Sequence, residues 1–257
     1  MRITVRTDCP VAKDSLDHVE PKGTAQDNSR NRRFNWKLYD LYRDLDRPLR
    51  ILDLGCAGGG FVRDCVYDGR MAVGIEGSDY SAELGRAEWL LLGGRFLFTA
   101  DITRPFEVRT LEEDPAPGAR VAFDVVSLWE VLEHIAEPDL PTVFANIRSH
   151  LAPGGLVIAS ISDEPLPHHR TRQDVSWWAA YFEREQLTPV DDYRSYFGAQ
   201  FVRGPKYGAG GSFHVVATND AGRTPKIPAV RLTSRALDRF WYGSRVQRQL
   251  RHLLGID

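Results

Sequence analysis

Residues Arg50 to Gly60 read R-I-L-D-L-G-C-A-G-G-G, and this stretch decides the fold. Ile51 to Leu54 form a short apolar strand that runs into a glycine-rich turn, and a helix is expected to begin near Phe61. Glycine permits positive φ angles at a sharp bend and leaves no Cβ atom between a ligand and the backbone. Backbone N–H groups at the start of a helix are ready donors. The stretch therefore predicts a strand–turn–helix unit that holds a small molecule against the main chain.

The rest of the chain alternates strands with helices. The expected strands are 72–76, 95–100, 123–128, 156–161 and 212–218, and the expected helices are 61–67, 81–92, 140–151 and 176–185. Such alternation requires crossover connections, which are right-handed and produce a mostly parallel sheet covered on both faces. The sequence thus predicts a doubly wound α/β domain.

Two flanking segments differ from this central domain in character, so we divide the chain into 1–47, 48–219 and 220–257. Residues 1–31 are polar and are expected to form an arm that is loose unless something binds it. Residues 32–46 have helical spacing, and Trp36 and Tyr39 either pack against the domain or form a lid over a ligand. Residues 234–254 form an amphipathic pattern within a tail that has eight Lys/Arg and three Asp, a local charge of +5. Docking on the domain or on a second copy, as a homodimer, is expected; an anionic membrane or nucleic acid is the alternative.

The composition excludes several classes of protein. The chain of 257 residues is 42% hydrophobic and 26% charged, with a net charge of −2, so it has no general attraction for nucleic acid. It lacks an apolar run of about 20 residues and an N-terminal signal pattern, and we expect a cytoplasmic protein. Cys9, Cys56 and Cys65 follow no metal or disulfide spacing.

Acidic residues end three successive strands. Ligands of doubly wound folds bind at the carboxyl ends of the strands, which selects Asp53, Glu76, Asp101 and the segment 129–134. A carboxylate at Asp53 would repel a dinucleotide's pyrophosphate, but it suits the cationic amine of an amino-acid-bearing cofactor. Helix capping is the alternative role for Glu76 and Asp101.

The segment D-L-G-C-A-G-G resembles the first motif of class I S-adenosylmethionine-dependent methyltransferases, with Ala57 in place of the middle glycine. The resemblance covers roughly residues 34–218 and implies a Rossmann-like, seven-stranded, mostly parallel sheet with S-adenosylmethionine as cofactor. It implies that Asp53, Gly55 and Gly59 line the methionine end, that Glu76 binds the ribose hydroxyls, and that Asp101 and Ile102 contact adenine. The remaining cofactor residues that we expect are Cys56, Ala57, Gly77 and Trp129.

The same resemblance places the methyl acceptor beyond the fourth strand, at Trp129-Glu130-Val131-Leu132-Glu133-His134. Methyl transfer needs alignment and, for an oxygen nucleophile, a base. We expect His134 to be that base, assisted by Glu130 and His169, because imidazole titrates near neutral pH.

The spacing Glu130-x-x-Glu133-His134 suggests a metal site, because residues i, i+3 and i+4 share one face of a helix. It looks like the E-x-x-E-H set of ubiquinone-pathway O-methyltransferases and small-RNA 3′-terminal 2′-O-methyltransferases. This resemblance implies Mg²⁺ or another divalent cation, completed by a histidine of the pair His168-His169. Metal-free relatives carry the same letters, so both interpretations stay open.

The sequence therefore predicts an S-adenosylmethionine-dependent O-methyltransferase that acts on a small-molecule or carbohydrate hydroxyl. The pair Trp177-Trp178 either stacks on the acceptor or packs in the core. An RNA ribose 2′-O-methyltransferase, which the near-neutral charge disfavours, and a non-catalytic partner subunit are the alternatives.

Overall fold

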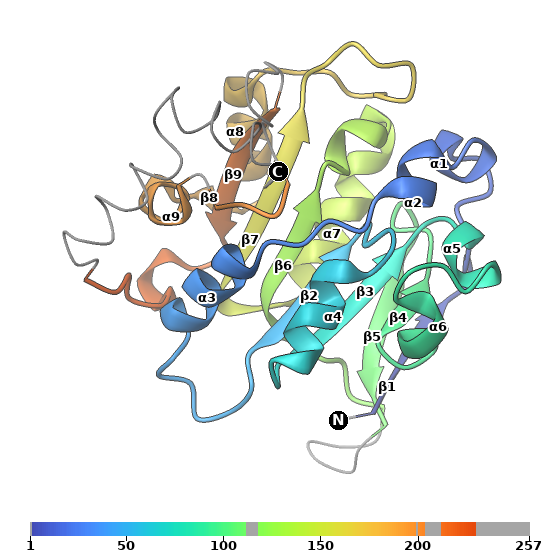
Figure 1. Cartoon of the computed structure of the whole chain (residues 1–257). Helices are drawn as coiled ribbons and strands as arrows, with labels where there is room; N and C mark the ends of the chain where they lie inside the picture. The colour runs from blue at the N-terminus through green and yellow to red at the C-terminus, as the bar shows by residue number, and fades with distance from the viewer. Residues whose placement is uncertain (1, 112–117, 199, 204–211, 230–257) are drawn as a thin grey trace, which may run out of the picture.

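The computed structural model describes residues 2–111, 118–198, 200–203 and 212–229 (Figure 1). Its centre is a seven-stranded sheet in the order β4-β3-β2-β6-β7-β9-β8. The strands are β2 (Arg50–Leu54), β3 (Met71–Glu76), β4 (Leu97–Thr99), β6 (Phe123–Trp129), β7 (Leu151–Ser162), β8 (Thr188–Pro189) and β9 (Ser212–Thr218). Strands β2, β3, β4, β6 and β7 are parallel, whereas β9 runs antiparallel to both β7 and β8. The expected mostly parallel, doubly wound sheet is confirmed.

Strand β2 lies at the point where the chain changes direction across the sheet. It pairs with β3 on one side and with β6 on the other, so that Asp53 lies opposite Gly74 and Ser127. The loops that leave β2 and β6 therefore diverge, and such a switch point forms a crevice at the carboxyl ends of the strands.

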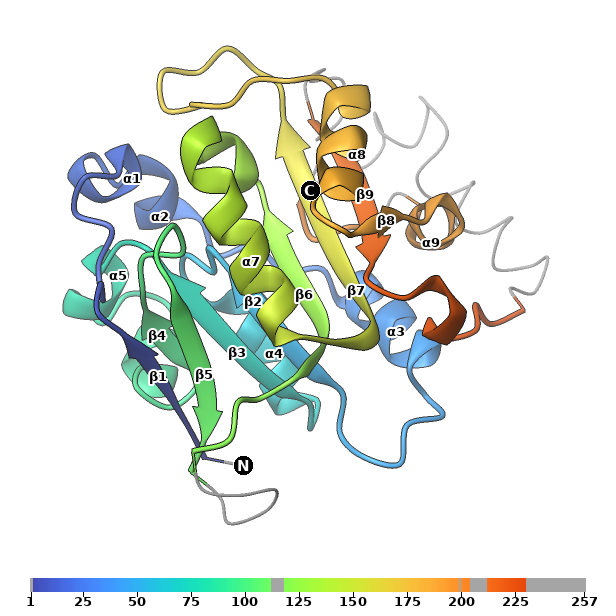
Figure 2. The ribbon, with the colours of Figure 1, turned by 180° about the vertical axis from the view of Figure 1, so that it is seen from behind.

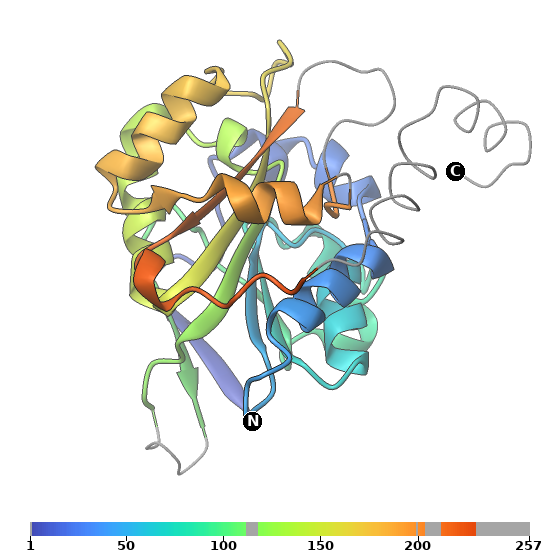
Figure 3. The ribbon, with the colours of Figure 1, turned by 90° about the vertical axis from the view of Figure 1, so that its left-hand side faces the viewer.

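Helices cover both faces of the sheet (Figure 3). One face carries α3 (Arg32–Leu41), α4 (Gly60–Tyr67), α6 (Trp89–Leu92) and α9 (Asp191–Phe197), while the other carries α7 (Leu140–His150) and α8 (Val175–Arg184). Figure 2 shows α7 and α8 on the second face. Phe34 and Phe144, both fully buried, belong to the two separate apolar cores that result.

The N-terminal arm is held by the domain and is not loose. Strand β1 (Ile3–Thr7) pairs antiparallel with β5 (Phe106–Thr110) in a second sheet, and α1 (Leu16–Val19) and α2 (Lys22–Gln26) follow it. In β1 the apolar Ile3 and Val5 alternate with polar residues, which is the period of a strand with one buried face. Both α1 and α2 lie at the carboxyl ends of the central strands (Figure 1).

The helix expected over 81–92 is broken in two. Helix α5 (Tyr80–Glu83) ends before Gly85 and Ala87, which have φ angles of 57° and 51°, and α6 begins at Trp89. The break lets the Trp89 indole donate to the carbonyl of Ala57 at 2.7 Å. The start of α6 therefore contacts the glycine-rich turn at the point where the helix is interrupted.

Helix α3 belongs to the core and is shorter than expected, since it ends at Leu41. Its Phe34 packs against Phe61 and Phe197, while Trp36 is 61% exposed and the Tyr39 hydroxyl donates to Asp68. The expected C-terminal helix over 234–254, and most of the expected loop over 111–120, lie outside the described residues. Within the described ranges every helix is too short or too polar to span a bilayer.

Candidate active site

A cavity of about 940 Å³ lies at the carboxyl ends of the strands, within the range of about 300–1,000 Å³ that is usual for ligand pockets. Most of the expected cofactor residues line it: Gly55, Ala57, Glu76, Gly77, Asp101, Ile102 and Trp129. The expected acceptor residues Glu130, His134 and His169 line the same cavity. Asp53, Cys56, Gly59 and Glu133 do not line it.

The glycine-rich turn serves the protein's own packing as well as the cavity. Gly59 precedes α4 with a φ of 82°, a conformation in which L side chains are strained. A Cβ atom at Gly58 would lie only 2.7 Å from the side-chain oxygen of Asn28. The backbone N–H of Gly58 also donates to the carbonyl of Asp27 at 3.0 Å. Part of the turn therefore docks the N-terminal segment, and Gly55 and Ala57 face the ligand space.

Asp53 lies behind the turn and is only 2% exposed. Its Oδ1 accepts a hydrogen bond from the Ser127 hydroxyl at 2.7 Å. Burial, together with the negative charge of Glu76, raises the pKa of Asp53 to about 8. The carboxyl group that the sequence places at the mouth of the turn is therefore a buried group, and it is largely protonated at neutral pH.

Glu76 is the carboxylate that faces the cavity at the end of β3. Oε2 accepts from the backbone N–H of Ala57 at 2.6 Å, and Oε1 accepts from that of Ser78 at 3.2 Å. Oε1 also accepts from the Thr24 hydroxyl at 3.5 Å, whereas Oε2 can still receive a donor from a ligand, because each carboxylate oxygen can accept more than one hydrogen bond. The backbone contacts fix the carboxylate at the end of the strand.

Asp101 ends β4 in a local turn, where its Oδ1 accepts from both the backbone and the hydroxyl of Thr103. A strap over residues 8–17 crosses this end of the cavity. Its Cys9 carbonyl accepts from the Asp101 backbone at 2.9 Å, and its Ala12 N–H donates to the Gly77 carbonyl at 2.8 Å. The N-terminal segment, not α3, covers the expected cofactor site. The alternation of apolar and polar residues over 3–7 is the sequence pattern that indicates an ordered strand in this segment.

Trp129 lines the cavity and has a buried indole N–H. Its indole Nε1 makes no full hydrogen bond within the described part of the chain, but it lies close enough to the Asp53 carboxyl group to lower the pKa of that group.

The carboxylates of the expected Glu130, Glu133 and His134 metal set are engaged elsewhere. Glu130 follows β6 with a φ of 56°, and the only helix of this segment is the short 3₁₀ helix η1 (Leu132–His134), so the expected α-helical face does not form. Glu130 Oε2 pairs with Arg203 at 2.6 Å. Glu133 is fully buried; its Oε1 accepts from the Ser162 N–H at 2.7 Å, and burial raises its pKa to about 7.

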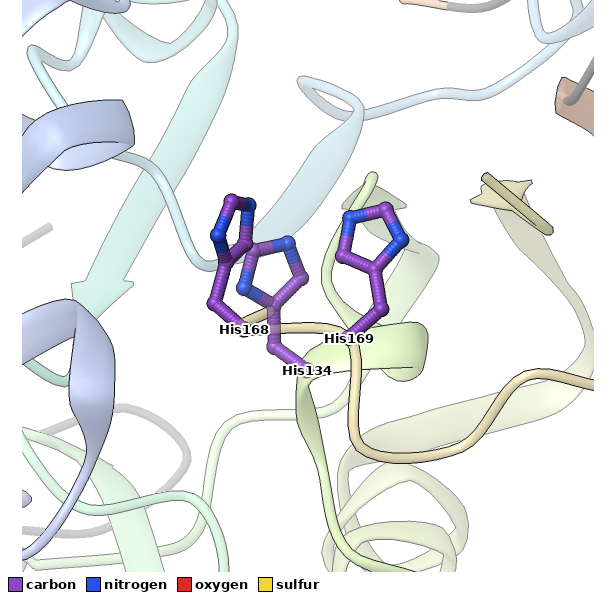
Figure 4. Close-up of side chains that lie close together, drawn as sticks. All are labelled: His134, His168 and His169. Carbon is purple, nitrogen blue, oxygen red and sulfur yellow. The ribbon is translucent and has the colours of Figure 1, made fainter. Parts of the chain in front are cut away.

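Three histidines meet at the acceptor end of the cavity instead (Figure 4). His134 comes from η1, and His168 and His169 come from the loop after β7. Their ring centroids lie 4.9–5.0 Å apart. The His134 Nδ1 lies 2.8 Å from Oδ2 of Asp17. Burial lowers the pKa of His134, but the hydrogen bond and charge of Asp17 outweigh it, and the net pKa is raised.

Sequence reasoning missed Asp17 and Arg203, which reach the cavity from distant parts of the chain. Arg203 joins Glu130 to Asp27, whose Oδ1 lies 3.4 Å from its Nη1. The pair Trp177-Trp178 lies outside the cavity: Trp178 is fully buried in the core, and Trp177 stacks on Tyr181. Of the two interpretations of this pair, core packing is the one that fits.

The comparisons with known proteins agree with this geometry. A family described as a methyltransferase domain matches residues 27–200. The chain belongs to this family, that of the class I S-adenosylmethionine-dependent methyltransferases.

Individual relatives are more distant and match only part of the chain. A ubiquinone biosynthesis O-methyltransferase of Cereibacter sphaeroides is 32% identical over 123 residues, which are 46% of this chain and 45% of that protein. A probable fatty acid methyltransferase of Mycobacterium tuberculosis is 34% identical over 109 residues, 42% of this chain and 23% of that one. The chain thus spans less than half the length of these curated relatives.

One solved structure shows the same fold at low sequence identity. The 1,6-didemethyltoxoflavin-N1-methyltransferase of Burkholderia thailandensis, solved with bound 1,6-didemethyltoxoflavin and S-adenosylhomocysteine, has a TM-score of 0.53 and 17% identity. The similarity covers 79% of this chain and 84% of that chain.

Proposed function

We propose that the protein transfers the methyl group of S-adenosylmethionine to a hydroxyl oxygen of a small-molecule or carbohydrate acceptor. One observation carries the proposal: the carboxylates of Glu76 and Asp101 and the His134–Asp17 pair line one cavity. The carboxylates suit the hydroxyl and amino donors of a nucleoside, and the imidazole suits the removal of a hydroxyl proton.

The chain's own residues fit the cofactor. Glu76 would accept from the ribose hydroxyls and Asp101 from the adenine amino group, with Ile102 against the ring. The indole of Trp129 would line the methionine end of the cofactor beside Asp53. Gly55, Ala57 and Gly77 would let the cofactor approach the backbone, and Asp53, behind the turn, would supply negative charge once the cationic end of the cofactor favours its ionised form. When bound, the cofactor supplies an activated methyl group on a sulfonium.

The acceptor would lie at the histidine end of the cavity. His134 would take the hydroxyl proton at Nε2, because its Nδ1 is held by Asp17. Glu130 and His169 would orient the acceptor at the same end. The deprotonated acceptor oxygen then attacks the methyl carbon, and S-adenosylhomocysteine leaves as a neutral thioether. The step needs no further co-reactant.

A paired acceptor panel tests the proposal. Purified protein is incubated with S-adenosylmethionine and with phenols, catechols and sugars, each matched to its amine analogue. The expected result is formation of S-adenosylhomocysteine with hydroxyl acceptors, whereas turnover with amines alone would overturn it. The curated O-methyltransferase relative supports the choice of oxygen. The RNA and partner-subunit alternatives depend on residues 234–254, as does the homodimer, and all three stay predictions outside the described residues.

A further inference from the structure

We propose that His134, His168 and His169 bind a divalent transition-metal ion of the zinc type at the acceptor end of the cavity. One nitrogen of each ring lies within 4.8 Å of the nitrogens of the other two. Within the described ranges this is the one group of three or more His, Cys, Asp or Glu side chains that meets so closely. All three rings also line the cavity, so an ion and an acceptor can reach them.

Hydrogen bonds to the far side of two rings prepare them as ligands. His134 presents Nδ1 to the carboxylate of Asp17, and His169 presents Nδ1 to the carbonyl of Glu164, each at 2.8 Å. A carbonyl or carboxylate only accepts, so in both rings the proton of the neutral form is on Nδ1 and the lone pair is on Nε2. Carboxylate and carbonyl partners of this kind orient metal-binding histidines in many proteins.

The fold holds the two loop histidines against η1. The Glu133 carbonyl accepts from the backbone N–H groups of Arg170 and Thr171 at 2.7 and 3.0 Å. The Thr171 hydroxyl donates to the Ile135 carbonyl at 2.7 Å, and the Glu133 side chain accepts from Ser162. The buried Glu133 therefore acts as a positioning residue that fixes the loop beside His134.

The donor set selects the class of ion. Imidazole suits zinc, copper and nickel, whereas Mg²⁺ prefers oxygen ligands. Zn–N distances are about 2.0–2.1 Å, so nitrogens of a tetrahedral site stand roughly 3.4 Å apart, and binding would draw the rings together. Three protein ligands leave a fourth position open, which is the pattern of catalytic rather than structural zinc sites.

This inference rests on the proposed function for the place of the acceptor, and it changes one step of that function. With the ion bound, His134 is a ligand and no longer the base. The acceptor hydroxyl would occupy the open position, where the ion lowers its pKa so that its proton is lost to water. The resulting oxygen anion attacks the methyl carbon as the bond from carbon to sulfur breaks, which leaves S-adenosylhomocysteine.

Calorimetry with the chelator-treated full chain tests the site. We expect one equivalent of Zn²⁺ to bind, and Mg²⁺ at the same concentrations not to bind. Asp17→Asn should weaken Zn²⁺ binding by about 10- to 100-fold, as is usual for partners of metal ligands, and His168→Ala and His169→Ala should weaken it further. His18→Ala is the matched control, because His18 lies outside the cluster, and it should bind as the unmodified chain does.

A thermal melt of each variant without metal identifies any that fail to fold, and Zn²⁺ should raise the midpoint of the unmodified chain but not that of His168→Ala. Stoichiometric Zn²⁺ binding that is unchanged in Asp17→Asn, His168→Ala and His169→Ala would overturn the site, as would a complete lack of Zn²⁺ binding. S-adenosylmethionine affinity, measured on the same samples, separates the two proposals. Intact cofactor binding without metal binding overturns the metal site alone, and metal binding without cofactor binding overturns the proposed function alone.

Discussion

Oε2 of Glu76 accepts a hydrogen bond from the backbone N–H of Ala57 at 2.6 Å. This contact joins the end of β3 to the turn after β2, the two elements that form the cofactor side of the cavity. Ala57 has a φ of 45°, in the left-handed region that glycine adopts more easily. The carboxylate at the strand end thus helps to stabilise a turn in which alanine replaces a glycine.

The same carboxylate gives the first prediction. Glu76→Ala should weaken S-adenosylmethionine binding by about 100-fold or more, because hydrogen bonds to charged groups contribute about 1.5–3 kcal/mol each. Calorimetry measures the affinity, and a melt of the free variant checks its folding. Glu107→Ala is the control, since Glu107 lies on β5 outside the cavity. Equal affinity of the two variants would show that Glu76 does not hold the cofactor.

Asp53 gives a prediction for pH dependence. Its pKa in the folded protein, about 8, lies above the unfolded value near 3.9, so the folded state binds the proton more tightly. The contribution of Asp53 to stability is therefore complete below about pH 4 and is lost as the pH rises toward 8. Asp53→Asn stays neutral, and it should be more stable than the unmodified chain at pH 8 by about 1 kcal/mol or more, with little difference at pH 4. Urea unfolding at the two pH values measures this.

The same substitution, which should raise stability at pH 8, should weaken cofactor binding. A cationic ligand near Asp53 favours its ionised form, so S-adenosylmethionine affinity should rise between pH 6 and pH 8, and Asp53→Asn should bind more weakly and without this rise. A pH-independent affinity in the unmodified chain, or undiminished binding by Asp53→Asn or Asp53→Ala, would contradict the placement of the cationic end of the cofactor near Asp53.

Arg203 gives a prediction for stability. Arg203→Met leaves the partly buried Glu130 without its 2.6 Å partner, and it removes the link to Asp27. We expect the free energy of unfolding to fall by about 1–3 kcal/mol. The control Arg194→Met removes a surface pair with Asp191 and should change it by less than about 0.5 kcal/mol. If the two variants unfold at the same urea concentration, Arg203 does not link the N-terminal segment to the end of β6.

His134 gives a prediction for catalysis. In metal-free protein, where His134 is the base, His134→Ala should lower kcat by about 10²- to 10⁴-fold, the usual effect of losing an acid–base group, and should leave S-adenosylmethionine affinity within about threefold. His18→Ala should keep the activity of the unmodified chain. Steady-state formation of S-adenosylhomocysteine with a hydroxyl acceptor provides kcat. A normal kcat for His134→Ala would remove His134 from the reaction.

The fold and the cofactor side could be predicted because they depend on local patterns. Apolar runs indicated six of the seven central strands, whereas β1, β5 and β8 were not expected. The acidic residues Glu76 and Asp101 were recognisable since each follows a strand at the same edge of the sheet. Asp53 also ends a strand, but its burial depends on packing against Ser127, which no local pattern reveals.

The acceptor side depends on long-range contacts, and there sequence reasoning was weaker. The letters E-x-x-E-H suggested a helical face, but the positive φ of Glu130 and the pairing with Arg203 prevent it. Asp17 lies 117 positions before His134, and the short polar elements around it gave no sign of that contact. Glycine in the turn was assigned to ligand approach, although at Gly58 the group that approaches is Asn28.

The position of the transferred methyl group tests the central claim most directly. The protein is incubated with S-adenosylmethionine labelled with ¹³C in its methyl group and with the panel of hydroxyl and amine acceptors, and the products are analysed by mass spectrometry and carbon NMR. We predict a labelled methyl bound to oxygen, which disappears with Glu76→Ala. A label found only on nitrogen or carbon, or an absence of transfer to every hydroxyl acceptor, would contradict the account.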